Sequence, residues 1–224
     1  MNYEIDYRPI AKSGDTLLCD GNGVLSDSIQ LFQGLLRGKI QFAHLSHCAK
    51  VIRFTPDEIK GILIFSANAN LVSWVMDRYN EEDKEDMICV FDAWWPKARI
   101  SLMSDWLKNY DGKVWVRRQE IIDPSRYQPN EIAFVQETLG VGYNTLFELI
   151  RCGMACNKKS DNVRMDCSEA VARCDQRCNT LPLTVIADNV APDDLYPGNY
   201  IDKVMQDYGV AKYGDMVRLT AYRR

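Results

Sequence analysis

A cysteine at the expected start of a helix is the strongest candidate nucleophile in this sequence. Asp166-Cys167-Ser168-Glu169 opens a stretch in which apolar residues and cysteines recur at three- and four-residue spacing, as on one face of a helix. Asp166 and Glu169 stand three residues apart just before that pattern, which is the aspartate form of a capping box. We therefore expect Asp166 to be the N-cap and Cys167 the first helical residue.

This position would activate the thiol of Cys167. Unpaired backbone N–H groups and the positive end of the helix dipole lower a cysteine pKa from about 8.5 toward 7 or below. The adjacent N–H groups, including that of Ser168, could hold the oxyanion that forms when the sulfur attacks a carbonyl. The alternative is that Cys167 is a small core thiol, because free cysteines are commonly buried.

A catalytic cysteine needs a base, and the sequence has only two histidines, His44 and His47. Ser46-His47 opens a strand predicted over residues 46–54, in which backbone pairing would hold the His47 ring at the sheet edge. Alternation along this strand puts His47 and Cys48 on opposite faces. The alternative is that His47 has a structural role and not a catalytic one. His44 lies in the irregular segment before the strand, and His44-x-x-His47 as a metal pair has no third ligand placed with it.

Asp92 could orient the base. It directly follows an apolar strand predicted over residues 87–91 and precedes Ala93-Trp94-Trp95-Pro96. A carboxylate at the end of a buried strand is costly to bury unless it is paired. Asp92 could accept a hydrogen bond from one ring nitrogen of His47 and fix its tautomer. The alternative is an exposed aspartate at a strand end.

The elements that must position these residues mix strands and helices without a strict βαβ rhythm, so we expect the α+β class. Further strands are predicted over residues 14–20, 62–65, 113–118, 183–187 and 216–219. Helices are predicted over residues 24–37, 101–108, 130–139 and 144–154, with another starting near residue 166. Gly21-Asn22-Gly23 is a turn and not a phosphate loop, because no Lys-Ser/Thr pair follows it.

Composition narrows the class of protein. The chain has 224 residues, 46% of them hydrophobic and 26% charged, which is the balance of a globular protein. Lys and Arg number 27 against 31 Asp and Glu, with no basic block, so we expect no nucleic-acid partner. No apolar run approaches the roughly 20 residues of a membrane-spanning helix. The N-terminal residues do not resemble a signal peptide, so we expect a cytoplasmic protein, intracellular or associated with a phage or virus, with free thiols.

Taken together, these motifs resemble the permuted branch of the NlpC/P60 papain-like cysteine hydrolases, whose members include YiiX-like and poxvirus proteins. The order and spacing of the motifs over roughly residues 13–200 carry the resemblance. The matching segments are Gly14-Asp15-Thr16-Leu17-Leu18, Ser46-His47, Asp92, Lys113-Val114-Trp115-Val116-Arg117, Gly142-Tyr143-Asn144, Asp166-Cys167-Ser168-Glu169 and Ala191-Pro192-Asp193-Asp194-Leu195.

The resemblance implies a single domain over residues 1–224 with a circularly permuted papain-like fold, an antiparallel sheet packed with helices. Cysteine precedes histidine in ordinary papain-like enzymes, whereas here His47 precedes Asp92 and Asp92 precedes Cys167. The resemblance makes Cys167 the nucleophile, His47 the acid and base and Asp92 the orienting group, and it places Tyr143 near the oxyanion or substrate. No cofactor is implied.

Relatives in this family cut peptidoglycan-type peptides or act on lipid acyl groups, so a peptide, a peptidoglycan fragment or an acyl lipid is the implied substrate. Two features depart from the family pattern. Many relatives carry glutamate where this chain has Asp92, which is one methylene shorter. The stretch between His47 and Asp92 is also long, and residues 55–86 are expected to be an insertion.

The remaining cysteines leave three readings open. Cys152-x-x-x-Cys156 and Cys174-x-x-x-Cys178 could form a four-thiolate zinc site, a disulfide-tied helical hairpin or simply buried thiols. Cys19, Cys48 and Cys89 lie in apolar strands and are expected to be packing residues.

Two alternatives to a cleavage enzyme also remain. The fold could serve as a non-catalytic binding or structural module, and a zinc site at the four paired cysteines is one form that such a module could take. It could also be a lipid enzyme at a membrane surface, with Trp94-Trp95 and the apolar residues 71–76 forming an interfacial patch. The alternative for Trp94-Trp95 is that these aromatic side chains pack in the core or line the cleft.

Overall fold

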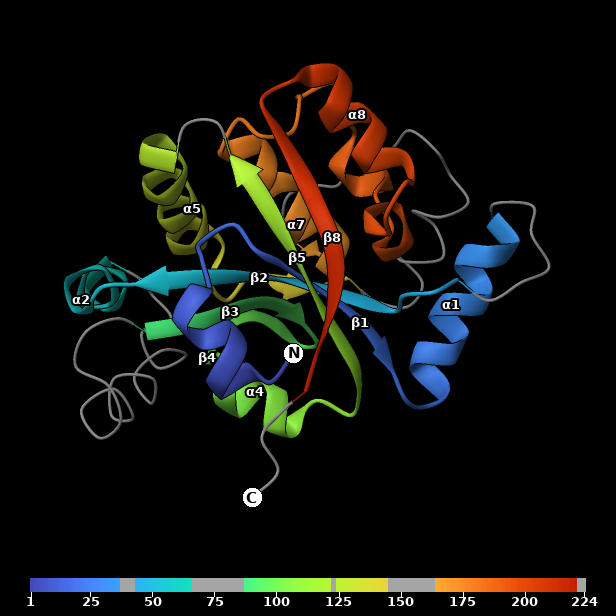
Figure 1. The fold of residues 1–224 in the computed structure, drawn as a ribbon, viewed down its shortest axis with the longest axis horizontal. Helices are drawn as coiled ribbons and strands as arrows, with labels where there is room; N and C mark the ends of the chain where they lie inside the picture. Colours follow the sequence, from blue (N-terminus) through green and yellow to red (C-terminus); the bar gives the residue numbers. More distant parts are fainter. Residues whose placement is uncertain (37–42, 66–86, 122–123, 145–163, 221–224) are drawn as a thin grey trace.

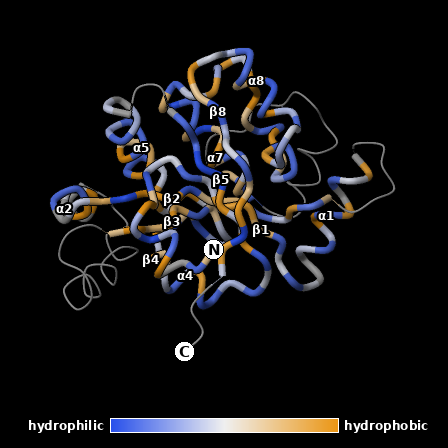
Figure 2. Tube along the Cα trace, viewed as in Figure 1, coloured by the Kyte–Doolittle hydropathy of each residue, from blue (hydrophilic) through white to orange (hydrophobic). Residues whose placement is uncertain are grey.

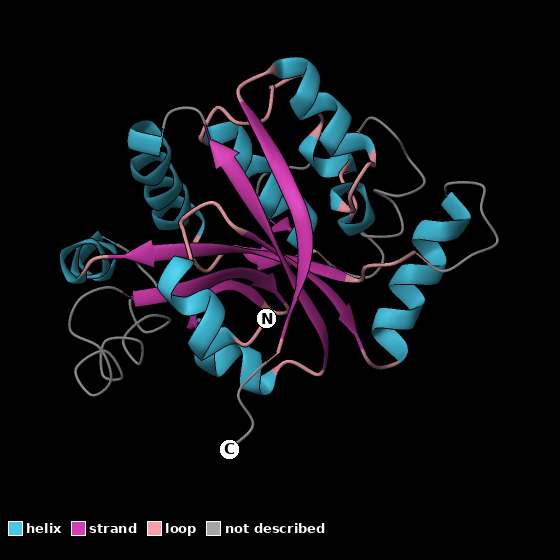
Figure 3. Cartoon of the chain, in the orientation of Figure 1, coloured by secondary structure: helices cyan, strands magenta, loops and turns pink. Residues whose placement is uncertain are grey.

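One eight-stranded sheet organises the chain (Figures 1 and 3). The structure is a computed structural model that describes residues 1–36, 43–65, 87–121, 124–144 and 164–220. Within these residues the strand order is β7-β6-β4-β3-β2-β1-β5-β8, and every pairing is antiparallel except that of β6 with β7. The strands are β1 (Thr16–Gly21), β2 (His47–Phe54), β3 (Met87–Trp94), β4 (Lys97–Leu102), β5 (Gly112–Ile121), β6 (Gly142–Tyr143), β7 (Arg164–Met165) and β8 (Ala211–Leu219).

Helices cover both faces of the sheet. Figure 1 shows α5, α7 and α8 toward one side of the strands and α4 toward the other. The α-helices are α1 (Val24–Leu36), α2 (Pro56–Phe65), α4 (Met103–Asn109), α5 (Pro124–Thr138), α7 (Cys167–Arg177) and α8 (Tyr200–Tyr208). The short π- and 3-10 turns are η1 (Tyr3–Tyr7), η2 (Arg8–Ile10), η3 (Ala187–Asn189) and η4 (Pro192–Leu195). This mixed architecture confirms the expected α+β class with an antiparallel sheet packed by helices.

The alternation of β2 divides the core into two sides. Ala49 and Val51 pack with Trp106 of α4, whereas Cys48 packs with Val171 of α7. Figure 2 shows the apolar stretches of the central strands gathered in the middle of the molecule. Because a one-residue slip would exchange the two sides, burial of both faces fixes the register of β2 against β1 and β3.

The predicted strand at 62–65 is wrong, because these residues belong to helix α2. A reciprocal cap starts this helix: the Thr55 N–H donates to Glu58 Oε2 at 2.7 Å and the Glu58 N–H donates to Thr55 Oγ1 at 3.3 Å. Pro56 follows at the first helical position, where its fixed φ favours a helix. These start signals outweigh the short apolar run, which periodicity alone does not assign to a strand or a helix.

Other elements also differ from the prediction in their type or their boundaries. Residues 183–187 form turns and the start of η3 instead of a strand. The helix predicted over 101–108 begins after β4, at Met103, and α5 begins at Pro124, ahead of the predicted residue 130. The strand predicted at 216–219 is the last part of β8, at one edge of the sheet. The predicted helix at 144–154 and most of the expected insertion at 55–86 lie outside the described residues.

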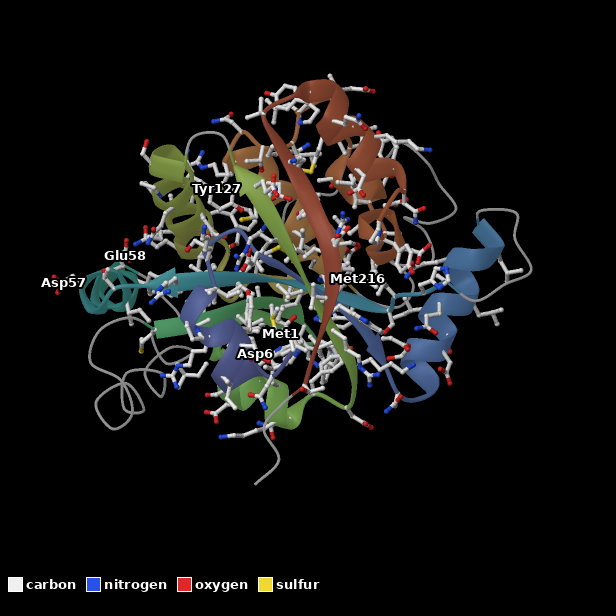
Figure 4. The ribbon with its side chains drawn as sticks, in the orientation of Figure 1. Met1, Asp6, Asp57, Glu58, Tyr127 and Met216 are labelled. Carbon is white, nitrogen blue, oxygen red and sulfur yellow. The ribbon has the colours of Figure 1, made fainter. Side chains whose placement is uncertain are left out.

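The two ends of the described chain lie side by side. Asn2 forms a parallel bridge with Thr220. The Met1 ammonium donates to the Arg218 carbonyl at 3.0 Å, and the Thr220 N–H donates to the Met1 carbonyl at 2.9 Å. Figure 4 places Met1 and Asp6 on the same side of the sheet, by the N-terminal turns.

A buried ion pair joins β2 to α7 beneath this sheet. Lys50 and Asp175 have side chains that are 0% and 1% exposed, and their charged atoms lie 2.9 Å apart. The ammonium also donates to the Gly14 carbonyl at 2.9 Å and to Thr16 Oγ1 at 3.1 Å. Asp175 accepts in addition from the Tyr213 hydroxyl at 2.7 Å, so the charges of both partners are compensated.

Glu131 of α5 is a second buried ionisable group, and it is only partly satisfied. Its Oε1 accepts from the Gly14 N–H at 3.2 Å, while Oε2 has no hydrogen-bond partner among the described residues. Burial raises the pKa of Glu131 to about 8, even though the nearby Lys50 ammonium lowers it. The folded protein therefore holds this carboxyl neutral at a pH where the unfolded chain ionises it.

This shift predicts how stability depends on pH. A carboxyl with a raised folded pKa contributes its full stability below its ordinary pKa near 4.5 and loses it as the pH rises through about 8. In Glu131→Gln this loss should disappear. The stability of the variant relative to wild type should therefore rise by roughly 3 kcal/mol between about pH 5 and about pH 8. Urea unfolding of both proteins at the two pH values measures this, and a relative stability that does not change with pH would contradict it.

Candidate active site

His47 and Asp92 come together from neighbouring strands. Lys50 of β2 pairs with Phe91 of β3, and this register extended along both strands places Trp94 opposite His47 and Asp92 two residues away on the same face. His47 Nε2 lies 2.7 Å from Asp92 Oδ1, and both side chains are buried. The contact is an ion pair and not a well-aligned hydrogen bond. The Trp94 ring packs edge-on against the imidazole, with centroids 4.7 Å apart.

Asp92 is held by two further groups that the sequence did not reveal. The indole N–H of Trp106, from α4, donates to Asp92 Oδ2 at 3.0 Å. Arg99 pairs with Asp92 in the β3–β4 register, and its Nη2 lies 3.6 Å from the same oxygen. Burial by itself would raise the pKa of Asp92, but the His47 charge and these donors hold it below its ordinary value. The carboxylate beside His47 is therefore ionised.

The predicted capping box at the start of α7 is confirmed. Asp166 Oδ1 accepts from the Glu169 N–H at 2.8 Å, and Glu169 Oε2 accepts from the Asp166 N–H at 3.4 Å. Helix α7 begins at Cys167, as the spacing indicates. The cap thus places the Cys167 sulfur at the N-terminal tip of the helix, next to the start of β2.

Two residues of β2 act on that sulfur. Nε2 of His47 faces Asp92, and the positive charge of His47 acts on the Cys167 sulfur. Cys48, the next residue along β2, also lowers the pKa of Cys167. Residues on both faces of β2 therefore act on the sulfur.

These contacts favour a charged pair. The hydrogen bond from Cys48 and the positive charge of His47 hold the pKa of Cys167 well below its ordinary value, although burial opposes them. Burial would lower the pKa of His47, but the negative charges of Asp92 and Cys167 outweigh it and raise that pKa to about 10. At pH values between the lowered pKa of Cys167 and the raised pKa of His47, the site holds a thiolate beside an imidazolium.

A thiolate at Cys167 predicts selective alkylation. At about pH 6 iodoacetamide should label Cys167 ahead of the other seven cysteines, because a thiol without such activation is protonated at that pH. Peptide mapping by mass spectrometry after brief exposure measures the order of labelling. Equal labelling of all eight cysteines would count against a thiolate at this position.

Tyr143 and Ser168, the two residues expected near the oxyanion, are placed differently. Burial and the negative charge of Cys167 raise the pKa of Tyr143, so its hydroxyl remains neutral near the Cys167 side chain. The Ser168 hydroxyl donates to the Val190 carbonyl at 2.6 Å, with Asp166 Oδ1 at 2.9 Å, and its backbone N–H is directed to Asp166. Both donors of Ser168 are thus engaged inside the protein. The Cys167 N–H is the first amide of the helix and lies outside the Asp166 cap.

The structure also locates residues for which the sequence left alternatives open. The His44 N–H donates to Asp193 Oδ1 at 2.8 Å and its ring stacks on Tyr196, so it packs against η4. Trp95 is 73% exposed at the β3–β4 turn, whereas Trp94 packs on His47.

The paired cysteines are placed only in part. Cys174 and Cys178 are buried in the core of α7, and Cys178 donates to the Tyr127 carbonyl at 3.6 Å. Cys152, Cys156 and residues 71–76 lie outside the described residues, so the four-thiolate zinc site and the interfacial patch stay predictions. Among the residues that the structure describes, no group of three His, Cys, Asp or Glu side chains is arranged to hold a metal ion.

The site adjoins a cavity of about 670 Å³ on the α4 side. Residues from the end of β1, from β3 and β4 and from α4 line it, among them Gly21, Asp92, Trp94, Arg99, Asp105 and Tyr110. A Cβ at Gly21 would lie 2.5 Å from Ser26 Oγ and 3.1 Å from the Tyr110 hydroxyl, so a larger residue at this position would displace these side chains. The cavity thus reaches the back of the His47–Asp92 pair and holds charges of both signs, from Arg99 and Asp105.

The chain is similar in fold to the crystal structure of metalloprotein yiiX from Escherichia coli O157:H7. The TM-score is 0.47, with 15% identity over 91% of this chain and 96% of that chain. No protein-family model and no curated protein matches the chain. In the described part of the chain, each helix is too short or too polar to cross a lipid bilayer.

Proposed function

We propose that this protein is a thiol-dependent acyl-transfer enzyme that cleaves an amide or ester bond. The observation that carries the proposal is the His47 imidazole held between the Asp92 carboxylate and the Cys167 sulfur. Nucleophile, base and orienting group follow one another in contact, which is the arrangement that activates a thiol for acyl chemistry.

The proposed first half-reaction forms an acyl-enzyme. The Cys167 thiolate adds to the carbonyl carbon, and the carbonyl oxygen becomes an oxyanion that the Cys167 N–H and the Tyr143 hydroxyl stabilise. The intermediate then collapses, the bond to the leaving amine or alcohol breaks, and the leaving group takes the proton of the His47 imidazolium. A thioester on Cys167 and a neutral imidazole remain.

The second half-reaction restores the enzyme. Neutral His47 removes a proton from water or from another acceptor as it attacks the thioester, and Cys167 leaves as the thiolate. The Asp92 carboxylate keeps the imidazole oriented and stabilises its positive charge in both halves. Because the imidazolium is the acid of the first half, activity should fall as the pH rises through about 10.

We further propose that the chain is a single permuted NlpC/P60-like domain. The order His47, Asp92, Cys167 along the chain and their meeting at the end of β2 support this. A peptide, a peptidoglycan fragment or an acyl lipid is the substrate that the family resemblance implies. The cytoplasmic location expected from the sequence stays part of this proposal.

Trapping of the acyl-enzyme tests the proposal. The protein is mixed with activated amide, ester and thioester compounds carrying peptide or fatty-acyl groups, quenched in acid and examined by intact mass and peptide mapping. We expect a hydroxylamine-sensitive acyl group on Cys167 from at least one class. If no class acylates Cys167 while iodoacetamide still labels it selectively, the protein is a binding module that retains a reactive thiol.

A further inference from the structure

A second cavity lies at the end of the central strands opposite to the candidate active site. Its volume is about 660 Å³, which is the size of a small-molecule site. Residues just before β1 and at the ends of β2 and β5 line it, whereas His47 opens β2. At about 3.3 Å per strand residue, Arg53 of this lining lies roughly 20 Å from His47. Figure 4 labels Tyr127 of α5, which also lines the cavity.

Basic side chains outnumber acidic ones in this lining. Lys12, Arg53 and Arg118 are the basic residues, and Glu120 is the acidic residue among the described residues of the lining. The Glu120 carboxylate already pairs with the Lys212 ammonium at 2.9 Å. A cavity with this balance of charge attracts an anion.

The Arg118 guanidinium is held in place at the cavity wall. Its Nε and Nη2 lie 3.4 Å from the two carboxylate oxygens of Asp15, and Nη2 also donates to the Ile10 carbonyl. Within the part of the chain that the structure describes, these contacts leave Nη1 for another acceptor. Because the guanidinium is already fixed, a ligand that binds Nη1 orders little further side chain.

Gln119 gives the cavity a second requirement. Its side chain is almost fully buried, and its Nε2 donates to Thr180 Oγ1 at 3.3 Å. The Thr180 hydroxyl donates its own proton to the Asp175 carbonyl at 3.1 Å, so it can only accept from Gln119, and this fixes the orientation of the amide. Gln119 Oε1 then has no hydrogen-bond partner among the described residues. A buried acceptor without a donor is costly, so a ligand that supplies one is favoured.

We propose that this cavity binds a small organic anion, a carboxylate or a phosphate, that also carries an N–H or O–H donor. The anionic group lies between Lys12 and Arg118, and the donor reaches Gln119 Oε1. An N-acylated amino acid and a polyol phosphate both have this chemistry. The proposal goes beyond the acyl-transfer function and does not depend on it, because the two cavities share no described lining residue.

Nuclear magnetic resonance titration of the ¹⁵N-labelled full chain tests the proposal. N-acetylglycine and glycerol 3-phosphate are the probes, at constant ionic strength, with N-acetylglycinamide as the probe without a charge and acetate as the probe without a donor. We expect saturable shifts of the Lys12, Arg53 and Gln119 amides with at least one of the two anions. Acetate and N-acetylglycinamide should bind about fivefold more weakly or less, because each lacks one of the two interactions. The anion that saturates identifies the source as a carboxylate or a phosphate.

Two variants test the residues that carry the proposal. Lys12→Glu reverses a charge on an exposed side chain and should weaken binding about fivefold, with Lys203→Glu on the exposed face of α8 as the matched control that leaves binding unchanged. Gln119→Met keeps the length of the side chain and removes the acceptor, and it should also weaken binding about fivefold. Melting temperatures establish that each variant is folded, and Lys12→Glu decides the question if Gln119→Met is not.

Three results would overturn the proposal. Neither anion gives saturable shifts at these amides, or acetate and N-acetylglycinamide bind as well as the two anions, or Lys12→Glu and Lys203→Glu weaken binding equally. Acyl trapping on Cys167 is a separate measurement on the same protein. Failure at this cavity is therefore distinguishable from failure of the proposed acyl transfer.

Discussion

Cys167→Ala should abolish turnover of whichever compound acylates the wild-type protein, with a loss of about 10⁴-fold or more in kcat. Without the sulfur no acyl-enzyme forms, and His47 has no activated nucleophile to pair with. Removing one member of a nucleophile–base unit costs nearly as much as removing the whole unit, because the members act together.

The rate is measured on the substrate class found by acyl trapping, with Cys89→Ala as the control for loss of a buried thiol. The far-ultraviolet circular dichroism and melting temperature of both variants establish that they are folded. Turnover by a folded Cys167→Ala protein within tenfold of wild type would rule out covalent catalysis at this position.

The largest effect on stability is expected from Lys50→Met. Removal of the ammonium leaves the Asp175 carboxylate buried, 1% exposed, without its counter-charge. Breaking a buried ion pair in this way typically costs about 3–5 kcal/mol, since the remaining charge is neither hydrated nor compensated. The Gly14 carbonyl and Thr16 hydroxyl would also lose a donor.

Urea denaturation followed by tryptophan fluorescence measures this loss. The double variant Lys50→Met/Asp175→Asn removes both charges and keeps polar groups for Tyr213 and Tyr127, so it should regain a large part of the lost stability. A single variant within about 1 kcal/mol of wild type would show that this pair is compensated in another way.

Local signals predicted the start of α7 and the faces of β2. A capping box lies within four residues, and strand alternation has a fixed period of two, so both patterns can be read without tertiary information. The apolar run at residues 62–65 predicted a strand, and this prediction was wrong. The cap formed by Thr55 and Glu58 starts helix α2, which includes these residues. Strand β4 was not predicted either, although Ala98, Ile100 and Leu102 alternate and are buried.

The contacts that complete the site could not be predicted from the sequence in this way. The indole of Trp106 reaches Asp92 only because α4 folds back over β3, and the charge of His47 acts on Cys167 only because α7 packs against β2. Such contacts depend on how elements far apart in the chain pack. Alternation placed Cys48 on the face opposite His47, and only the docking of α7 shows that this face packs against Val171.

The bridge between Asn2 and Thr220 makes the described chain suitable for circular permutation in the laboratory. A peptide linker joining these two neighbouring ends, with a new opening cut between residues 144 and 164, would leave every strand where it is. Read from that opening, Cys167 would come before His47 and Asp92. A rejoined chain of this kind should keep the same sheet and the same neighbours at the site.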